Sequence, residues 1–101
     1  MKDLLSDNQY RKLRHVLMWN GEWERALLTD TASMSYEKML NHEKGTQWYA
    51  YKAVKDCEEL GLDAELLLSQ TLIGHAWEYR NKVLPRRREK TRKELKAEGI
   101  I

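Results

Sequence analysis

Residues 46–63 read TQWYAYKAVKDCEELGLD, and the spacing of the apolar residues in this stretch predicts a helical fold. Its apolar residues recur every three or four positions, the spacing of one helix face, at Ala50, Ala53, Val54, Cys57 and Leu60. Several of these side chains are small, which indicates that another helix approaches closely. Thr46 is suited to cap the first turn, and Gly61 is suited to end the last turn. We therefore predict a helix over 47–60 that packs against a neighbouring helix.

The residues that follow start a second helix. Asp63 is a suitable N-cap, and Leu62 and Leu67 form the flanking pair of a hydrophobic staple. Apolar residues then cover a wide arc as far as Val83, so we predict one continuous helix over 64–83 as the most buried element. Pro85 disfavours helical geometry at the residue before it, which predicts a break at 84.

This helix contains Gly74, where the chain could be divided to imitate a helix-turn-helix motif. Such a division would expose Trp77 and Tyr79 on the second helix and would leave the turn without a cap residue. We therefore expect a continuous helix and no base-specific readout.

The N-terminal third also reads as helical. Ser6 and Gln9 form a capping box, and the predicted core stripe consists of Tyr10, Leu13, Val16 and Leu17. Asn20 and Gly21 predict a stop or kink before a short helical piece over 22–28. Ser35 can start a further helix over 36–43, which Gly45 would end. No strand pattern occurs, and we predict an all-α, compact bundle of four or five helices.

Composition limits the classes of protein. The chain has 101 residues, enough for one core, and four Trp and five Tyr argue against disorder. A single Cys excludes a disulfide scaffold within one chain. No apolar run approaches the length of a membrane span, and residues 1–8 lack the apolar stretch of a signal peptide. We expect no membrane association and a cytoplasmic location.

The net charge of +2 hides an uneven distribution. Residues 1–79 carry nine Lys and Arg against thirteen Asp and Glu, whereas residues 80–101 carry nine against three. The body is therefore at −4 and the C-terminal segment at +6. We predict a helical bundle domain over 1–84 and a basic C-terminal helical arm over 85–101, which projects because its cations leave no apolar stripe to bury. Such an asymmetry indicates a charged partner.

The basic segment contains the main candidate binding residues: Arg80, Lys82, Arg86, Arg87, Arg88, Lys90, Arg92, Lys93 and Lys96. Arginine is suited to bidentate phosphate contacts, and several such contacts give affinity that depends steeply on salt. The same cations also suit an acidic protein surface, or a solvated helix held by pairs such as Lys90 with Glu94.

A second candidate site is aromatic. Trp48, Tyr49 and Tyr51 lie close together in the sequence, and their large rings cannot all face one core. Trp19 and Trp23 flank the predicted break at Gly21. Exposed Trp and Tyr are enriched at interfaces. We therefore predict a protein interface at these five rings, and a possible homodimer through them or through the terminal Ile100 and Ile101.

Patterns for catalysis or cofactor binding are weak. His75 and Glu78 stand three residues apart, but a metal site needs a second ligand pair. Cys57 lies within an apolar stripe, as a buried filler does. Phosphate-binding glycine motifs and nucleophile motifs do not occur. We expect no enzyme, no metal and no cofactor.

Two functions remain open. In the first, the chain is a small non-enzymatic binding protein whose basic arm contacts nucleic acid, or a complex that holds nucleic acid, through the phosphate backbone. In the alternative, it is a protein–protein inhibitor or adaptor, of the type of a viral or plasmid accessory protein, that docks on an acidic or nucleic-acid-binding surface of a partner.

Overall fold

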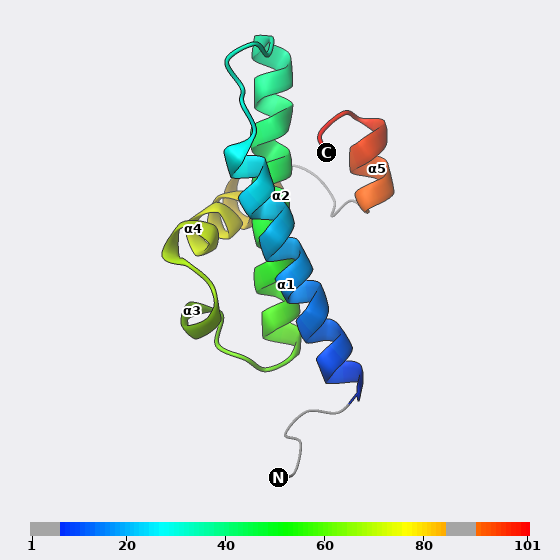
Figure 1. Ribbon diagram of the computed structural model, residues 1–101, viewed down its shortest axis with the longest axis vertical. Coiled ribbons are helices and arrows are strands. Elements are labelled where there is room, and N and C mark those ends of the chain that lie inside the picture. Colours follow the sequence, from blue (N-terminus) through cyan, green and yellow to red (C-terminus); the bar gives the residue numbers. More distant parts are fainter. Residues whose placement is uncertain (1–6, 85–90) are drawn as a thin grey trace.

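Two long helices form the frame of the molecule (Figure 1). The computed structural model describes residues 7–84 and 91–101. Helix α1 (Asp7–Leu28) and helix α2 (Tyr36–Glu59) make an antiparallel hairpin. Helices α3 (Ala64–Leu67) and α4 (Gln70–Glu78) return along one side, and the π-helical segment η1 (Tyr79–Val83) continues α4. Helix α5 (Arg92–Ala97) lies on the other side. The described residues contain no strand, so the predicted all-α bundle is confirmed.

Helix α1 runs through Gly21 without a break, so the predicted stop at this residue was wrong. Val16, Trp19 and Trp23 are buried on one face of α1. Burial of three large side chains outweighs the cost of about 1 kcal/mol for a glycine inside a helix. The core face differs from the predicted stripe, because Leu17 is 63% exposed. The predicted cap at Ser6 lies outside the described residues.

Helix α2 also runs through a predicted stop, at Gly45, and merges the predicted helices over 36–43 and 47–60. A Cβ atom on Gly45 would lie 2.4 Å from the carbonyl oxygen of Ile100. The glycine therefore makes room for the end of the chain instead of ending the helix. Thr46 donates its hydroxyl to the carbonyl oxygen of His42 at 2.9 Å and caps nothing. The predicted cap at Ser35 is confirmed.

The predicted stop after α2 is confirmed at Gly61, which has a φ of 73°. Asp63 caps α3 as predicted, with its carboxylate accepting from the backbone N–H of Glu65 at 2.9 Å. The continuous helix predicted over 64–83 was wrong, because Leu68 is extended and Ser69 caps α4. The element with the most buried residues is α2, which lies between α1, α4 and α5.

The core joins all the main elements, including the C-terminal segment. Leu95 is 3% exposed and Ile100 is 7% exposed, so the prediction that this segment has nothing to bury was wrong. A capping box between Thr91 and Glu94, which the prediction missed, starts α5. The buried apolar residues form one cluster: Val16, Trp19, Trp23, Trp48, Ala50, Tyr51, Ala53, Val54, Cys57, Leu68, Leu72, Ala76, Tyr79, Leu95 and Ile100. Within the described part of the chain, no helix is both long and apolar enough to cross a membrane.

Candidate functional site

The cations of α5 are held on the body of the protein. Leu95 points into the core, and the Ile100 backbone N–H donates to the carbonyl oxygen of Leu95 at 3.0 Å. Gly99 takes a φ of 78°, which lets the chain turn back after the helix. Ile100 then packs against Gly45 on α2. The helix that carries Arg92, Lys93 and Lys96 is therefore anchored by Leu95 within it and by Ile100 after its C-terminal end.

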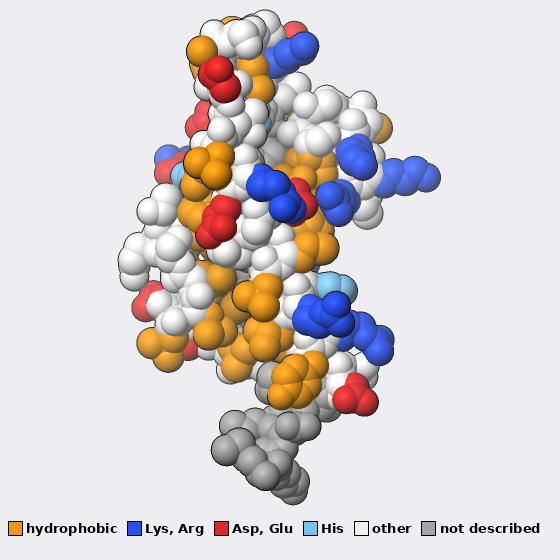
Figure 2. Space-filling view, viewed as in Figure 1, with side chains coloured by type: hydrophobic (Ala, Val, Ile, Leu, Met, Phe, Trp, Pro, Cys, Tyr) orange, Lys and Arg blue, Asp and Glu red, His pale blue; other side chains and the backbone are white. Residues whose placement is uncertain are grey.

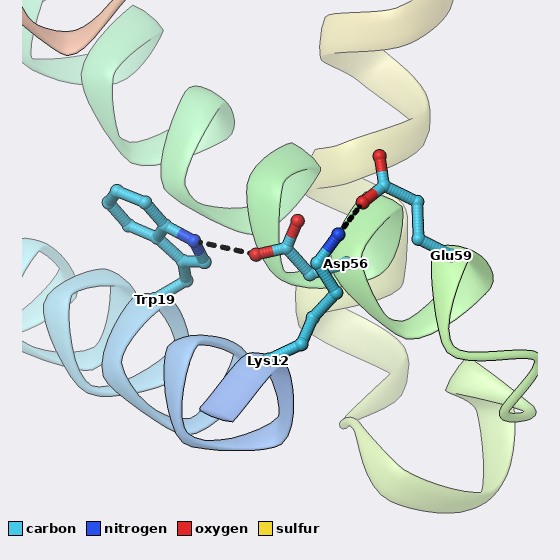
Figure 3. A network of polar contacts seen from close by, with 4 residues as sticks. All are labelled: Lys12, Trp19, Asp56 and Glu59. Carbon is cyan, nitrogen blue, oxygen red and sulfur yellow. Dashed lines mark hydrogen bonds and ion pairs between the residues drawn. The ribbon is translucent and has the colours of Figure 1, made fainter. Parts of the chain in front are cut away.

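Two cations from different helices meet over one indole ring. The guanidinium carbon of Arg92 lies 5.7 Å from the Trp19 ring centroid, and Lys52 Nζ lies 5.9 Å from it. Trp19 is itself fixed, because its Nε1 donates to Asp56 Oδ2 at 3.0 Å (Figure 3). In the same view, Lys12 of α1 pairs with Glu59 of α2. These contacts place positive charge from α2 and α5 at the α1–α2 seam.

Exposed cations extend this surface. Lys93 and Lys96 are exposed on α5, and Arg11 is exposed on α1, two helical turns before Trp19. Figure 2 shows blue side chains over α5 and, further down the same edge, over the N-terminal half of α1. We refer to the cationic surface at α5 and the Trp19 ring as the basic face, and it comprises Lys52, Arg92, Lys93 and Lys96.

Arg80 and Lys82 are paired with carboxylates instead. Arg80 donates to both oxygens of Glu58, at 2.7 and 3.3 Å. This contact lowers the pKa of the Glu58 carboxyl and raises the pKa of Arg80. Lys82 Nζ lies 3.0 Å from Glu78 and 5.9 Å from the Trp77 ring centroid. The remaining predicted cations lie outside the described residues: Arg86, Arg87, Arg88 and Lys90.

The predicted aromatic interface was wrong for four of its five rings. Trp48 is 1% exposed, and Trp19, Trp23 and Tyr51 are also buried, so these rings form the core. Tyr49 is half-buried and packs against Trp48 at 5.3 Å between ring centroids. The large rings that do reach the surface are at other positions: Tyr10, Tyr36 and Trp77. Their exposure depends on where the neighbouring helices lie, which the spacing of one helix cannot show.

The two candidate chemical groups have structural roles. His75 Nδ1 accepts a hydrogen bond from Trp23 Nε1 at 2.9 Å, while Glu78 pairs with Lys82 and not with His75. Cys57 is fully buried, and burial raises the pKa of its thiol, with Asp56 and Glu58 acting in the same direction. The interpretation of Cys57 as a core filler is confirmed, and His75 is held by its hydrogen bond with Trp23. Among the described residues, no three metal-ligating side chains gather.

Comparison with protein-family models, curated proteins and solved structures gives no significant match to this chain.

Proposed function

We propose that this protein is a non-enzymatic binding protein that holds the phosphate backbone of nucleic acid along its basic face. One observation carries the proposal: the cations of α5 are fixed on the body by Leu95 and Ile100, and Arg92 shares the Trp19 ring with Lys52. A chain segment that is already docked loses less backbone conformational entropy when it binds an extended anion than a free tail does.

The chemistry of the face suits phosphate. Arg92 presents a planar guanidinium group, which can hold two phosphate oxygens at once. Lys96 stands four residues further along α5 and therefore on the same side of the helix. Such contacts are independent of base sequence, so we propose backbone binding without base readout.

The alternative is a partner protein with an acidic surface. A protein partner is favoured by the 56% exposed Trp77, which together with Ile73 lines a surface groove of about 350 Å³ beside α3 and α4. Because Glu58, Asp63 and Glu65 line the same groove, the acidic part of that partner would contact the basic face and not the groove. Exposed Trp is enriched where proteins bind each other. In this alternative, the basic face would bind carboxylates on the surface of the partner protein.

The test measures affinity for a random-sequence duplex by fluorescence anisotropy over a range of salt concentrations. Each phosphate contact contributes about −0.9 to the slope of log K against log salt. The double variant Lys93→Ala with Lys96→Ala should therefore make the slope shallower by about 2. The matched control removes two exposed cations away from the basic face, Lys38 and Lys82, and should leave the slope almost unchanged.

The segment outside the described residues is tested separately with Arg86→Ala, Arg87→Ala and Arg88→Ala combined, which should flatten the slope further. Absence of binding at low salt, or an affinity that does not respond to salt, would overturn the proposal. A partner protein that stays bound after nuclease treatment, and whose binding the Lys93 and Lys96 variant weakens, would establish the alternative.

A further inference from the structure

The tip of the α1–α2 hairpin carries large apolar side chains at its surface. We define the hairpin tip as residues 27–44, which comprise the end of α1, the connection and the first turns of α2. In Figure 1, α2 extends past the end of α1, with the connection beside it. Leu28 is 85% exposed and Tyr36 is 74% exposed, and Leu27, Met39 and Leu40 are also exposed. Helices normally bury such side chains against another element.

These residues continue a stripe that is buried further along α2. At 100° per residue, Tyr36, Leu40, Tyr51 and Val54 fall within an arc of about 60°. Tyr51 and Val54 are buried, and the Tyr51 ring lies 5.0 Å from the ring of Tyr79 on η1. The stripe is therefore covered by α4 and η1 at one end of α2 and is exposed at the other.

The charges beside the exposed stripe are complementary to the same charges on a second copy of the chain. Glu37 and Lys44 stand seven residues apart, on the same edge of α2, with Leu40 between them. In an antiparallel crossing centred near Leu40, Glu37 of each copy faces Lys44 of the other, so that one two-fold axis forms both pairs. A parallel crossing would bring like charges together.

We propose that the hairpin tip binds a second copy of this chain, with the two α2 helices antiparallel and crossing at Leu40. Two hairpins packed in this way give a four-helix arrangement that buries the exposed stripe of each. Gly45, which receives the C-terminal segment, lies about 180° around α2 from Tyr36. The dimer therefore leaves the basic face open, and it does not depend on the proposed function.

This interface replaces the predicted pairing through Ile100 and Ile101. Ile100 is buried against its own chain, and Ile101 packs against the same core. Both residues therefore contribute to the fold of one protomer.

Sedimentation equilibrium over a range of protein concentrations tests the dimer. The wild-type mass should rise from 12.1 kDa to twice that value. Leu40→Glu should keep the protein monomeric, because it places carboxylates at the crossing point. The matched control is Leu66→Glu on α3, which changes another exposed leucine and should leave the dimer intact. Circular dichroism on each variant shows that the helices are retained.

The charge pair supplies a second, independent test. Glu37→Lys alone and Lys44→Glu alone should each weaken the dimer roughly tenfold or more, and the combined exchange should restore it. A wild-type chain that stays monomeric up to millimolar concentration would overturn the proposal. The proposal would also be overturned if Leu66→Glu dissociated the dimer while Leu40→Glu did not. It would be overturned as well if neither single charge change weakened the dimer.

Discussion

Gly45 and Gly74 both lie inside helices, but a methyl group added at each would meet different surroundings. At Gly45, an added Cβ would lie 2.4 Å from the Ile100 carbonyl oxygen and 2.8 Å from Ile101 Cγ2. At Gly74, an added Cβ meets no atom within 4 Å. Helix propensity alone favours alanine at both positions by about 1 kcal/mol. The two sites therefore separate helix propensity from close packing.

We expect Gly45→Ala to lower the free energy of unfolding by about 1–3 kcal/mol, since the backbone of Ile100 must move away. Gly74→Ala, its matched control, should raise the free energy of unfolding by up to about 1 kcal/mol. Urea titration followed by circular dichroism measures both. If Gly45→Ala were as stabilising as Gly74→Ala, the C-terminal segment would not rest on α2.

At the scale of elements, the caps at Ser35 and Asp63 and the stop at Gly61 were predicted correctly, whereas the cap at Thr46 and the stops at Gly21 and Gly45 were not. Ser35, Gly61 and Asp63 act within one turn of the chain, so their roles follow from neighbouring residues alone. Gly21 and Gly45 have the same local preferences as Gly61, but tertiary contacts decide their conformation. Burial of Trp19 and Trp23 stabilises α1 on both sides of Gly21. The docking of Ile100 against α2 explains why a glycine is needed at position 45 within that helix.

The contact between α2 and η1 should make stability depend on pH. The hydrogen bonds from Arg80 hold the pKa of Glu58 below its ordinary value, so the unfolded chain binds the proton more readily. The stabilisation is therefore present above the ordinary Glu pKa of about 4.3 and is lost as pH falls through the lower folded value. Because both side chains are about half exposed, we expect only about 0.2–1 kcal/mol.

A double-mutant cycle with Glu58→Gln and Arg80→Gln isolates this pair. The coupling free energy, obtained from urea titrations, should be present at neutral pH and should vanish in acid below the folded pKa of Glu58. A coupling that is equal at both pH values would show that ionisation of Glu58 contributes nothing.

At the scale of the whole molecule, the sequence located the positive charge but not the surface that holds it. The excess of cations after residue 79 is visible by counting. The fold then divides this set, because Arg80 and Lys82 pair with carboxylates, while Arg92 reaches the Trp19 ring, 73 positions away in the chain. Contacts between residues so far apart depend on how the helices pack, and no local pattern encodes them. Lys52 was missed for the same reason.

Leu95 decides whether the C-terminal segment is an arm or a part of the bundle. The sequence predicts a boundary between residues 84 and 85, and an independent arm would unfold without affecting the domain before it. Leu95 is 3% exposed in the common core, however, and Ile100 lies against α2.

Leu95→Ala should therefore lower the global free energy of unfolding by about 2–5 kcal/mol. Leu66→Ala, at an 83% exposed leucine, should change it by less than about 0.5 kcal/mol. Urea titration followed by tryptophan fluorescence measures unfolding of the core around Trp19 and Trp48. If Leu95→Ala left the unfolding transition unchanged, the domain boundary between residues 84 and 85 would hold, and residues 85–101 would form a separate arm.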